Sequence, residues 1–88
     1  MHYVYILYSQ KLNKFYVGRT DDLKRRLGEH NSGSTPFTAS GTPWKLVFYE
    51  AFMCGGDAVQ EELFLKTGQG RERRNYLLKE FNSTWRGV

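Results

Sequence analysis

The 88 residues are 40% hydrophobic and 16% aromatic, enough apolar mass for one compact domain over 1–88, with its core in about 3–80. A net charge of +4, from 13 Lys and Arg against 9 Asp and Glu, favours a polyanion such as nucleic acid as the partner. The single cysteine, Cys54, excludes a disulfide framework and a zinc site built on several cysteines. The N-terminal apolar run of only about six residues predicts neither a signal peptide nor a membrane span. A cytoplasmic protein is therefore expected.

The first elements are two strands and a helix. Residues 3–8 (YVYILY) form a β-branched and aromatic run that is typical of a buried strand, and 15–18 (FYVG) predict a second strand, paired with the first across a short polar turn. Thr20 is the expected N-cap of a helix with two acidic residues in its first turn. We expect that helix to reach about His30 and to end within 31–33.

A long loop, a third strand and a second helix follow. Residues 31–43 are rich in Gly, Ser, Thr and Pro, and long loops of this kind are often functional. Residues 44–52 (WKLVFYEAF) predict the third strand. Asp57 with Gln60 three residues on has the form of a capping box, which predicts a second helix up to about Lys66.

The C-terminal part is expected to contain one more helix. Residues 67–70 interrupt the helical pattern, a basic third helix is predicted over about 71–81, and 82–88 carry no clear signal. The predicted order is therefore β-β-α-β-α-α. Such an order describes an α+β fold in which helices flank a small, three-stranded, mainly antiparallel sheet.

The first predicted helix carries polar residues on its apolar stripe. With Leu23 at zero on a helical wheel, Leu27 lies at about +40°, His30 at about −20° and Arg26 at about −60°. Arg26 and His30 are therefore neighbours on the core-facing side. They are either an arginine that keeps its head in water and a hydrogen-bonded semi-buried histidine, or members of a functional site.

The second predicted helix places a carboxylate on its buried face. With Ala58 at zero, Glu62 lies at about 40° and Leu65 at about −20°, while Glu61 is at the edge at about −60°. A carboxylate in the middle of an apolar face is costly unless it is paired or binds a metal. Glu62 therefore indicates either a structural salt bridge, with Arg26 as one partner to consider, or a functional site.

At four places in order, the motifs of this chain resemble those of the GIY-YIG nuclease superfamily. Residues 3–5 (YVY) and 16–18 (YVG) are similar to the two paired motifs, with Tyr3 where the family name has glycine. The resemblance continues through 22–27 with His30-Asn31 behind it, and through 58–66. It is closest to the small stand-alone (YhbQ-like) branch, which also resembles the N-terminal incision domain of the repair protein UvrC.

The resemblance implies a role for each matching residue. Tyr5 and Tyr16 correspond to the tyrosines of the two motifs, and either one is the candidate general base. Arg26 matches the catalytic arginine of the family and His30 its frequent histidine partner. Glu62 matches the carboxylate that holds a single divalent metal, Mg²⁺ or Mn²⁺, which stabilises the developing charge and the leaving oxygen.

The resemblance and the charge pattern also imply a nucleic-acid surface. We expect it to join the loop 31–43 with the basic stretch 71–79, where Phe37 either stacks on a base or packs locally. Gly18 would allow close backbone approach near the site. The candidate contacts are Gly18, Arg19, Lys24, Asn31, Phe37 and Arg71.

The resulting prediction is a metal-dependent endonuclease that acts on DNA in repair or recombination. Two alternatives stay open: a non-catalytic nucleic-acid-binding module in which Glu62 and Arg26 pair, and an interaction domain that docks on a protein partner in a repair complex. No membrane partner is expected, and the chain is expected to be a monomer or a weak dimer.

Overall fold

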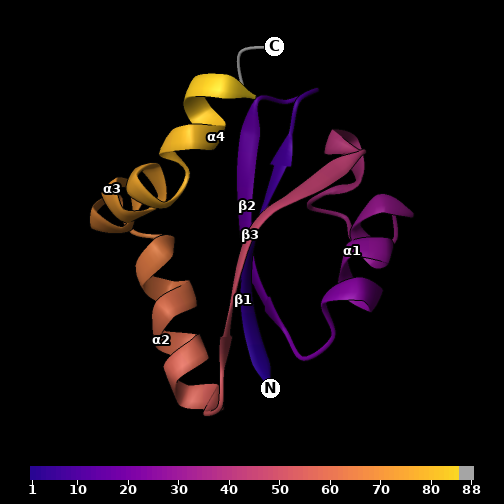
Figure 1. Cartoon of the computed structure of the whole chain (residues 1–88). Helices are drawn as coiled ribbons and strands as arrows, with labels where there is room; N and C mark the ends of the chain where they lie inside the picture. The colour runs from indigo at the N-terminus through magenta and orange to yellow at the C-terminus, as the bar shows by residue number, and fades with distance from the viewer. Residues whose placement is uncertain (86–88) are drawn as a thin grey trace.

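The computed structural model describes residues 1–85 and is built around one antiparallel sheet (Figure 1). Its strands are β1 (His2–Ser9), β2 (Lys14–Thr20) and β3 (Trp44–Phe52), in the order β2-β1-β3. The central strand β1 pairs antiparallel with both neighbours, so the expected three-stranded antiparallel sheet is confirmed.

The helices lie on the two faces of this sheet. Figure 1 shows α1 on one face and the other three helices on the opposite face. The helices are α1 (Leu23–Asn31), α2 (Gly55–Leu65), α3 (Gly68–Leu77) and α4 (Lys79–Thr84), with a single 3-10 turn at Ala39–Gly41. Within the described residues, no helix is both long and apolar enough to span a membrane.

The alternation of side chains along β1 divides the core into two layers. Val4 and Ile6 point to the face that α2 covers, where they pack with Ala58 and Leu65. The second layer contains Tyr5, Leu7 and Trp44, with Leu23 and Leu27 of α1 packed against them. Because β1 is buried on both faces, it reads as an unbroken apolar run, and Tyr5 is held on the α1 side.

Two expected helix starts are wrong. The carboxylate of Asp22, rather than the hydroxyl of Thr20, caps α1 by accepting the backbone N–H of Arg25 at 3.0 Å. Thr20 ends β2, and its hydroxyl donates to the backbone carbonyl of Asp22. The second helix begins at Gly55, which puts Asp57 inside its first turn and rules out the capping box.

The expected third helix is also wrong in its bounds. It starts at Gly68, because the hydroxyl of Thr67 accepts the backbone N–H of Gly70 at 3.0 Å and caps it. A Cβ at Gly70 would overlap the backbone at Phe64, so glycine permits the tight turn between α2 and α3. The helix ends near Leu78 and α4 follows, taking in part of the tail for which no structure was predicted, while 86–88 lie outside the described residues.

On the α2 side of the sheet, two carboxylates meet. Glu50 lies opposite Val4 in the β1–β3 register, which directs it towards Glu61 of α2, whose Oε2 is 3.3 Å from Arg73 Nη2. Burial, and then the hydrogen bond to Glu61, raise the pKa of Glu50 from 4.5 to about 7, although the charge of Arg73 opposes the rise.

This pair predicts a stability that depends on pH. Because the folded protein binds the Glu50 proton more tightly than the unfolded chain, the stabilisation is fully present below pH 4.5 and is lost as pH rises through about 7. The Glu50→Gln variant stays neutral at every pH. Relative to this variant, the free energy of unfolding of the wild type is expected to fall by about 1–2 kcal/mol between pH 4.5 and 8, after allowance for solvent screening. Urea unfolding of both proteins across this range measures the difference, and parallel curves would contradict the prediction.

Candidate active site

Two tyrosines from neighbouring strands share the α1 face of the sheet. Tyr5 of β1 lies opposite Gly18 of β2, and Tyr16 lies opposite Leu7, so the two rings are diagonal neighbours with centroids 6.4 Å apart. The expectation that the hairpin brings them together is confirmed. A Cβ at Gly18 would overlap the phenol of Tyr5, so glycine lets that ring lie across β2.

His30 joins this pair from the end of α1. Its side chain is fully buried, its Nε2 lies 2.9 Å from Tyr5 Oη, and its ring centroid is 4.9 Å from that of Tyr16. Its Nδ1 lies 2.8 Å from the hydroxyl of Thr38, which in turn donates to the carbonyl of Thr35 at 3.4 Å. Since that hydroxyl uses its proton on Thr35, we assign the imidazole proton to Nδ1, which leaves Nε2 to accept the proton of Tyr5.

The electrostatics agree with this assignment. Burial, with a further contribution from the charge of Arg26, lowers the pKa of His30, which favours the neutral ring. Burial raises the pKa of Tyr5, and the hydrogen bond from Arg26 opposes that rise. A neutral histidine beside a protonated phenol is therefore the resting state near neutral pH.

The loop between α1 and β3 holds this arrangement in place. The indole N–H of Trp44 donates to the carbonyl of Thr38 at 2.6 Å. Asn31 accepts the backbone N–H of Trp44 at 2.6 Å and donates to its carbonyl at 3.0 Å, so this exposed residue also closes the loop. Sequence reasoning missed Thr38, because a single threonine in a polar loop carries no periodicity that could mark it as buried.

Arg26 stands beside the tyrosine at the edge of the site. Its Nη1 is 2.8 Å from Glu29 Oε1. The hydrogen bond to Glu29, and to a smaller extent that to Tyr5, raises the pKa of Arg26 above its usual value. The guanidinium lines an open cavity of about 500 Å³ together with Arg19 and Arg25. Two carboxylates, Asp21 and Glu29, line the same cavity and pair with Arg25 and Arg26. The arginines still outnumber the acids, and guanidinium groups suit phosphate oxygens.

Glu62 reaches the site from the other layer of the fold. It lies between the fully buried Ala58 and Leu65, and its side chain is only 16% exposed, which confirms its place on the inner face of α2. Its Oε1 is 3.3 Å from Arg19 Nε and its Oε2 is 2.9 Å from Lys66 Nζ. The prediction of Arg26 as the salt-bridge partner of Glu62 is therefore wrong, because Arg19 and Lys66 are the partners.

The charge of the Glu62 carboxylate makes the smallest contribution to the raised pKa of Tyr5, after burial and the charge of Tyr16. No group of three or more His, Cys, Asp or Glu side chains suited to a metal occurs within residues 1–85. Glu62 fits a metal held by one carboxylate and several waters, as Mg²⁺ prefers. Its two partners, Arg19 and Lys66, are both exposed side chains that can release the oxygens.

The remaining predicted contacts do not form one surface. Phe37 is 88% exposed, so local packing of its ring is excluded, and Arg19, Lys24 and Arg71 are exposed as well. The loop 31–43 lies on the α1 side of the sheet, whereas α3, which carries Arg71, lies on the opposite side (Figure 1). A single surface joining that loop with 71–79 is therefore wrong, and Arg19 is the contact that adjoins the tyrosine cluster through Gly18.

Comparison with known proteins adds a family match. The family model described as "GIY-YIG catalytic domain" matches residues 1–76, which include every residue of the cluster. The chain is similar to a UPF0213 protein of Lacticaseibacillus paracasei, 35% identical over 97% of this chain and 94% of that one. A UPF0213 protein of Haloquadratum walsbyi is 36% identical over 90% of this chain and 88% of that one.

A solved structure is similar as well. The solution NMR structure of a UPF0213 protein from Bacillus halodurans is 34% identical, covers 86% of this chain and 83% of its own, and has a TM-score of 0.54. The similarity in sequence and in fold extends over most of both chains. The names of these relatives state no activity.

Proposed function

This chain belongs to the GIY-YIG family, and on that premise we propose that it is a metal-dependent endonuclease that hydrolyses phosphodiester bonds, with DNA as the substrate. The observation that supports the proposal most is the hydrogen-bonded chain from Tyr5 through His30 to Thr38, placed beside the guanidinium of Arg26. Phosphodiester hydrolysis needs a water that loses a proton next to a neutralised phosphate, and this arrangement supplies both.

Arg26 binds the phosphate in this proposal. Its planar guanidinium can donate two hydrogen bonds to the non-bridging oxygens, and it is held in place by Glu29 at 2.8 Å. Arg19 and Arg25 line the same cavity and can bind the flanking phosphates. Contacts of this kind position a strand without reading its sequence, so no recognition sequence is expected.

Tyr5 and His30 move the proton. The oxygen of Tyr5 accepts a proton from the attacking water while its own proton passes to His30 Nε2, 2.9 Å away. The hydroxyl of Thr38 keeps the Nδ1 proton in place and so holds the ring in the accepting tautomer. Tyr16 packs on His30 and limits access of bulk water to it.

Glu62 would hold the divalent metal, which supplies charge stabilisation for the phosphate and its leaving oxygen when bound. The pairing of Glu62 with Arg19 and Lys66 keeps its charge balanced before binding. These residues all belong to one chain, so the proposed site needs no second copy. A role in repair or recombination of DNA is part of the same proposal.

A nicking assay on supercoiled plasmid tests the proposal. Cleavage is expected with Mg²⁺ or Mn²⁺ and is expected to stop when a chelator is added. Arg26→Lys should reduce the rate by about 10²–10³-fold, because an ammonium group cannot donate the paired hydrogen bonds of a guanidinium. The matched control is Arg73→Lys on α3, outside this cavity, whose arginine pairs with Glu61 at 3.3 Å, and a reduction of less than about tenfold is expected there.

Three results would count against this function. Cleavage that persists in excess chelator would exclude the metal, and an Arg26→Lys protein as active as the control would remove Arg26 from the reaction. A wild type that binds DNA but cuts no plasmid or branched oligonucleotide with either metal would favour the non-catalytic binding module. The two salt bridges of Glu62 would then be its whole role.

A further inference from the structure

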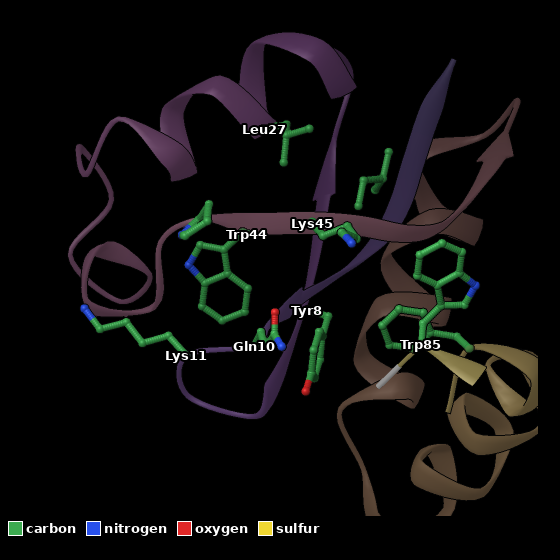
Figure 2. A pocket seen from close by; sticks show the side chains of 10 residues that line it. Tyr8, Gln10, Lys11, Leu27, Trp44, Lys45 and Trp85 are labelled. Carbon is green, nitrogen blue, oxygen red and sulfur yellow. The ribbon is translucent and has the colours of Figure 1, made fainter. Parts of the chain in front are cut away.

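An open groove lies next to the tyrosine cluster but outside it. Figure 2 shows Tyr8 and Lys45 between the indoles of Trp44 and Trp85, with Lys11 towards one end. The groove has a volume of about 760 Å³, within the usual range of ligand-binding pockets. Its lining comes from the turn after β1, the first residues of β3, α1 and the end of α4.

The lining combines aromatic rings with positive charge. Four aromatic side chains face the groove, and Lys11 and Lys45 are its only charged residues, with no carboxylate among the described lining residues. Trp85 is 66% exposed, and Lys45 Nζ lies 5.5 Å from the centre of its ring. Trp85 therefore presents exposed indole surface beside Lys45, and no carboxylate among the described lining residues opposes the two lysines.

The groove adjoins the tyrosine cluster through the buried ring of Trp44. The ring of Trp44 forms part of its wall and lies 6.3 Å from that of Tyr16, which itself lies 4.9 Å from His30. Arg26 lines the cavity of about 500 Å³ near His2 at the start of β1, whereas the groove lies near Tyr8 at its end, and the two share no lining residue. A bound strand would therefore have to span the length of β1 to reach both sites.

We propose that this groove is a stacking subsite for unpaired nucleobases of the bound strand, a proposal that rests on the function proposed above. Trp85 offers the exposed ring, and Lys11 and Lys45 bind the phosphates on either side. A base carries a flat apolar face and an anionic backbone, which match this lining. A duplex keeps its bases stacked inside, so only an unpaired segment can fill the subsite.

The competing occupant is an apolar protein segment, and it fits less well. Such a segment would cover the rings but would leave two lysines without a negative partner in a desolvated groove. A nucleic-acid strand matches both the aromatic rings, through its bases, and the lysines, through its phosphates. We therefore expect the affinity to depend on Trp85 and on the lysines together.

Binding of a fluorescein-labelled strand of about eight thymidines, measured by anisotropy in chelator, tests the subsite. Trp85→Ala is expected to weaken binding about tenfold, and Lys45→Gln a few-fold, with a shallower dependence on salt. The matched control is Tyr76→Ala, which removes a ring that is 69% exposed and also carries a lysine, Lys79, at 5.2 Å, but lies outside the groove. Circular dichroism checks that each variant is folded.

The outcomes separate this subsite from the catalytic proposal. If the wild type binds the strand and the binding depends on Trp85, but no DNA is cut, the subsite would be supported and the proposed hydrolysis would be contradicted. The subsite is overturned if Trp85→Ala binds the strand as tightly as wild type, or if Tyr76→Ala loses as much affinity. It is also overturned if wild type does not bind the strand at all, and the groove would then be left to an apolar protein segment.

Discussion

Replacing Glu62 with glutamine is expected to reduce metal-dependent cleavage at least 10³-fold, because the amide keeps the shape of the side chain but loses the charge that holds the metal. The fold should tolerate the change. Arg19 and Lys66, which the carboxylate contacts at 3.3 and 2.9 Å, are exposed and can be hydrated, so the loss of stability should stay below about 1 kcal/mol.

The neighbouring residue provides a close control for this experiment. Glu61 sits on the same helix, is 15% exposed and also contacts an arginine, Arg73, at 3.3 Å. Glu61→Gln should therefore cleave nearly as fast as wild type. Plasmid nicking over a Mn²⁺ titration compares the two variants, and equal activity of both would remove the metal from Glu62.

Tyr5→Phe is expected to reduce cleavage by about 10²–10⁴-fold, since it deletes the oxygen that takes the proton from water. It should also destabilise the protein by about 1–3 kcal/mol. The buried Nε2 of His30 loses its donor at 2.9 Å, and the interaction of Arg26 with the phenol is lost as well. Urea unfolding and single-turnover cleavage measure the two effects separately.

Tyr3→Phe is the control for the second experiment. Tyr3 lies on the same face of the same strand, but its ring packs against Tyr49, with centroids 6.1 Å apart, whereas the hydrogen bond to His30 Nε2 comes from Tyr5. Removal of the Tyr3 hydroxyl should leave both the cleavage rate and the free energy of unfolding close to those of the wild type. If Tyr5→Phe were equally active, Tyr16 would replace Tyr5 as the candidate base, and the pair with His30 would be structural.

The sequence by itself determined the elements that obey a periodic rule. Ten residues separate Tyr5 from Tyr16, a spacing with which a hairpin can bring both rings to one face, and the register of β1 and β2 does so. A helical period of 3.6 then placed His30 and Glu62 on inner faces, where the structure finds them buried or nearly so. Each of these inferences needs only neighbours within one element or one hairpin.

Tertiary structure alone decided the contacts that join distant segments. Three features depend on how the helices pack on the sheet. They are the hydrogen bond of Thr38 to His30, the pairing of Glu62 with Arg19 rather than Arg26, and the placement of the loop 31–43 and α3 on opposite sides of the sheet. The groove at Trp85 likewise combines four separate parts of the chain. Periodicity fixes the direction in which a side chain points, whereas its partner is selected by packing between elements, and this packing leaves no regular pattern in the sequence.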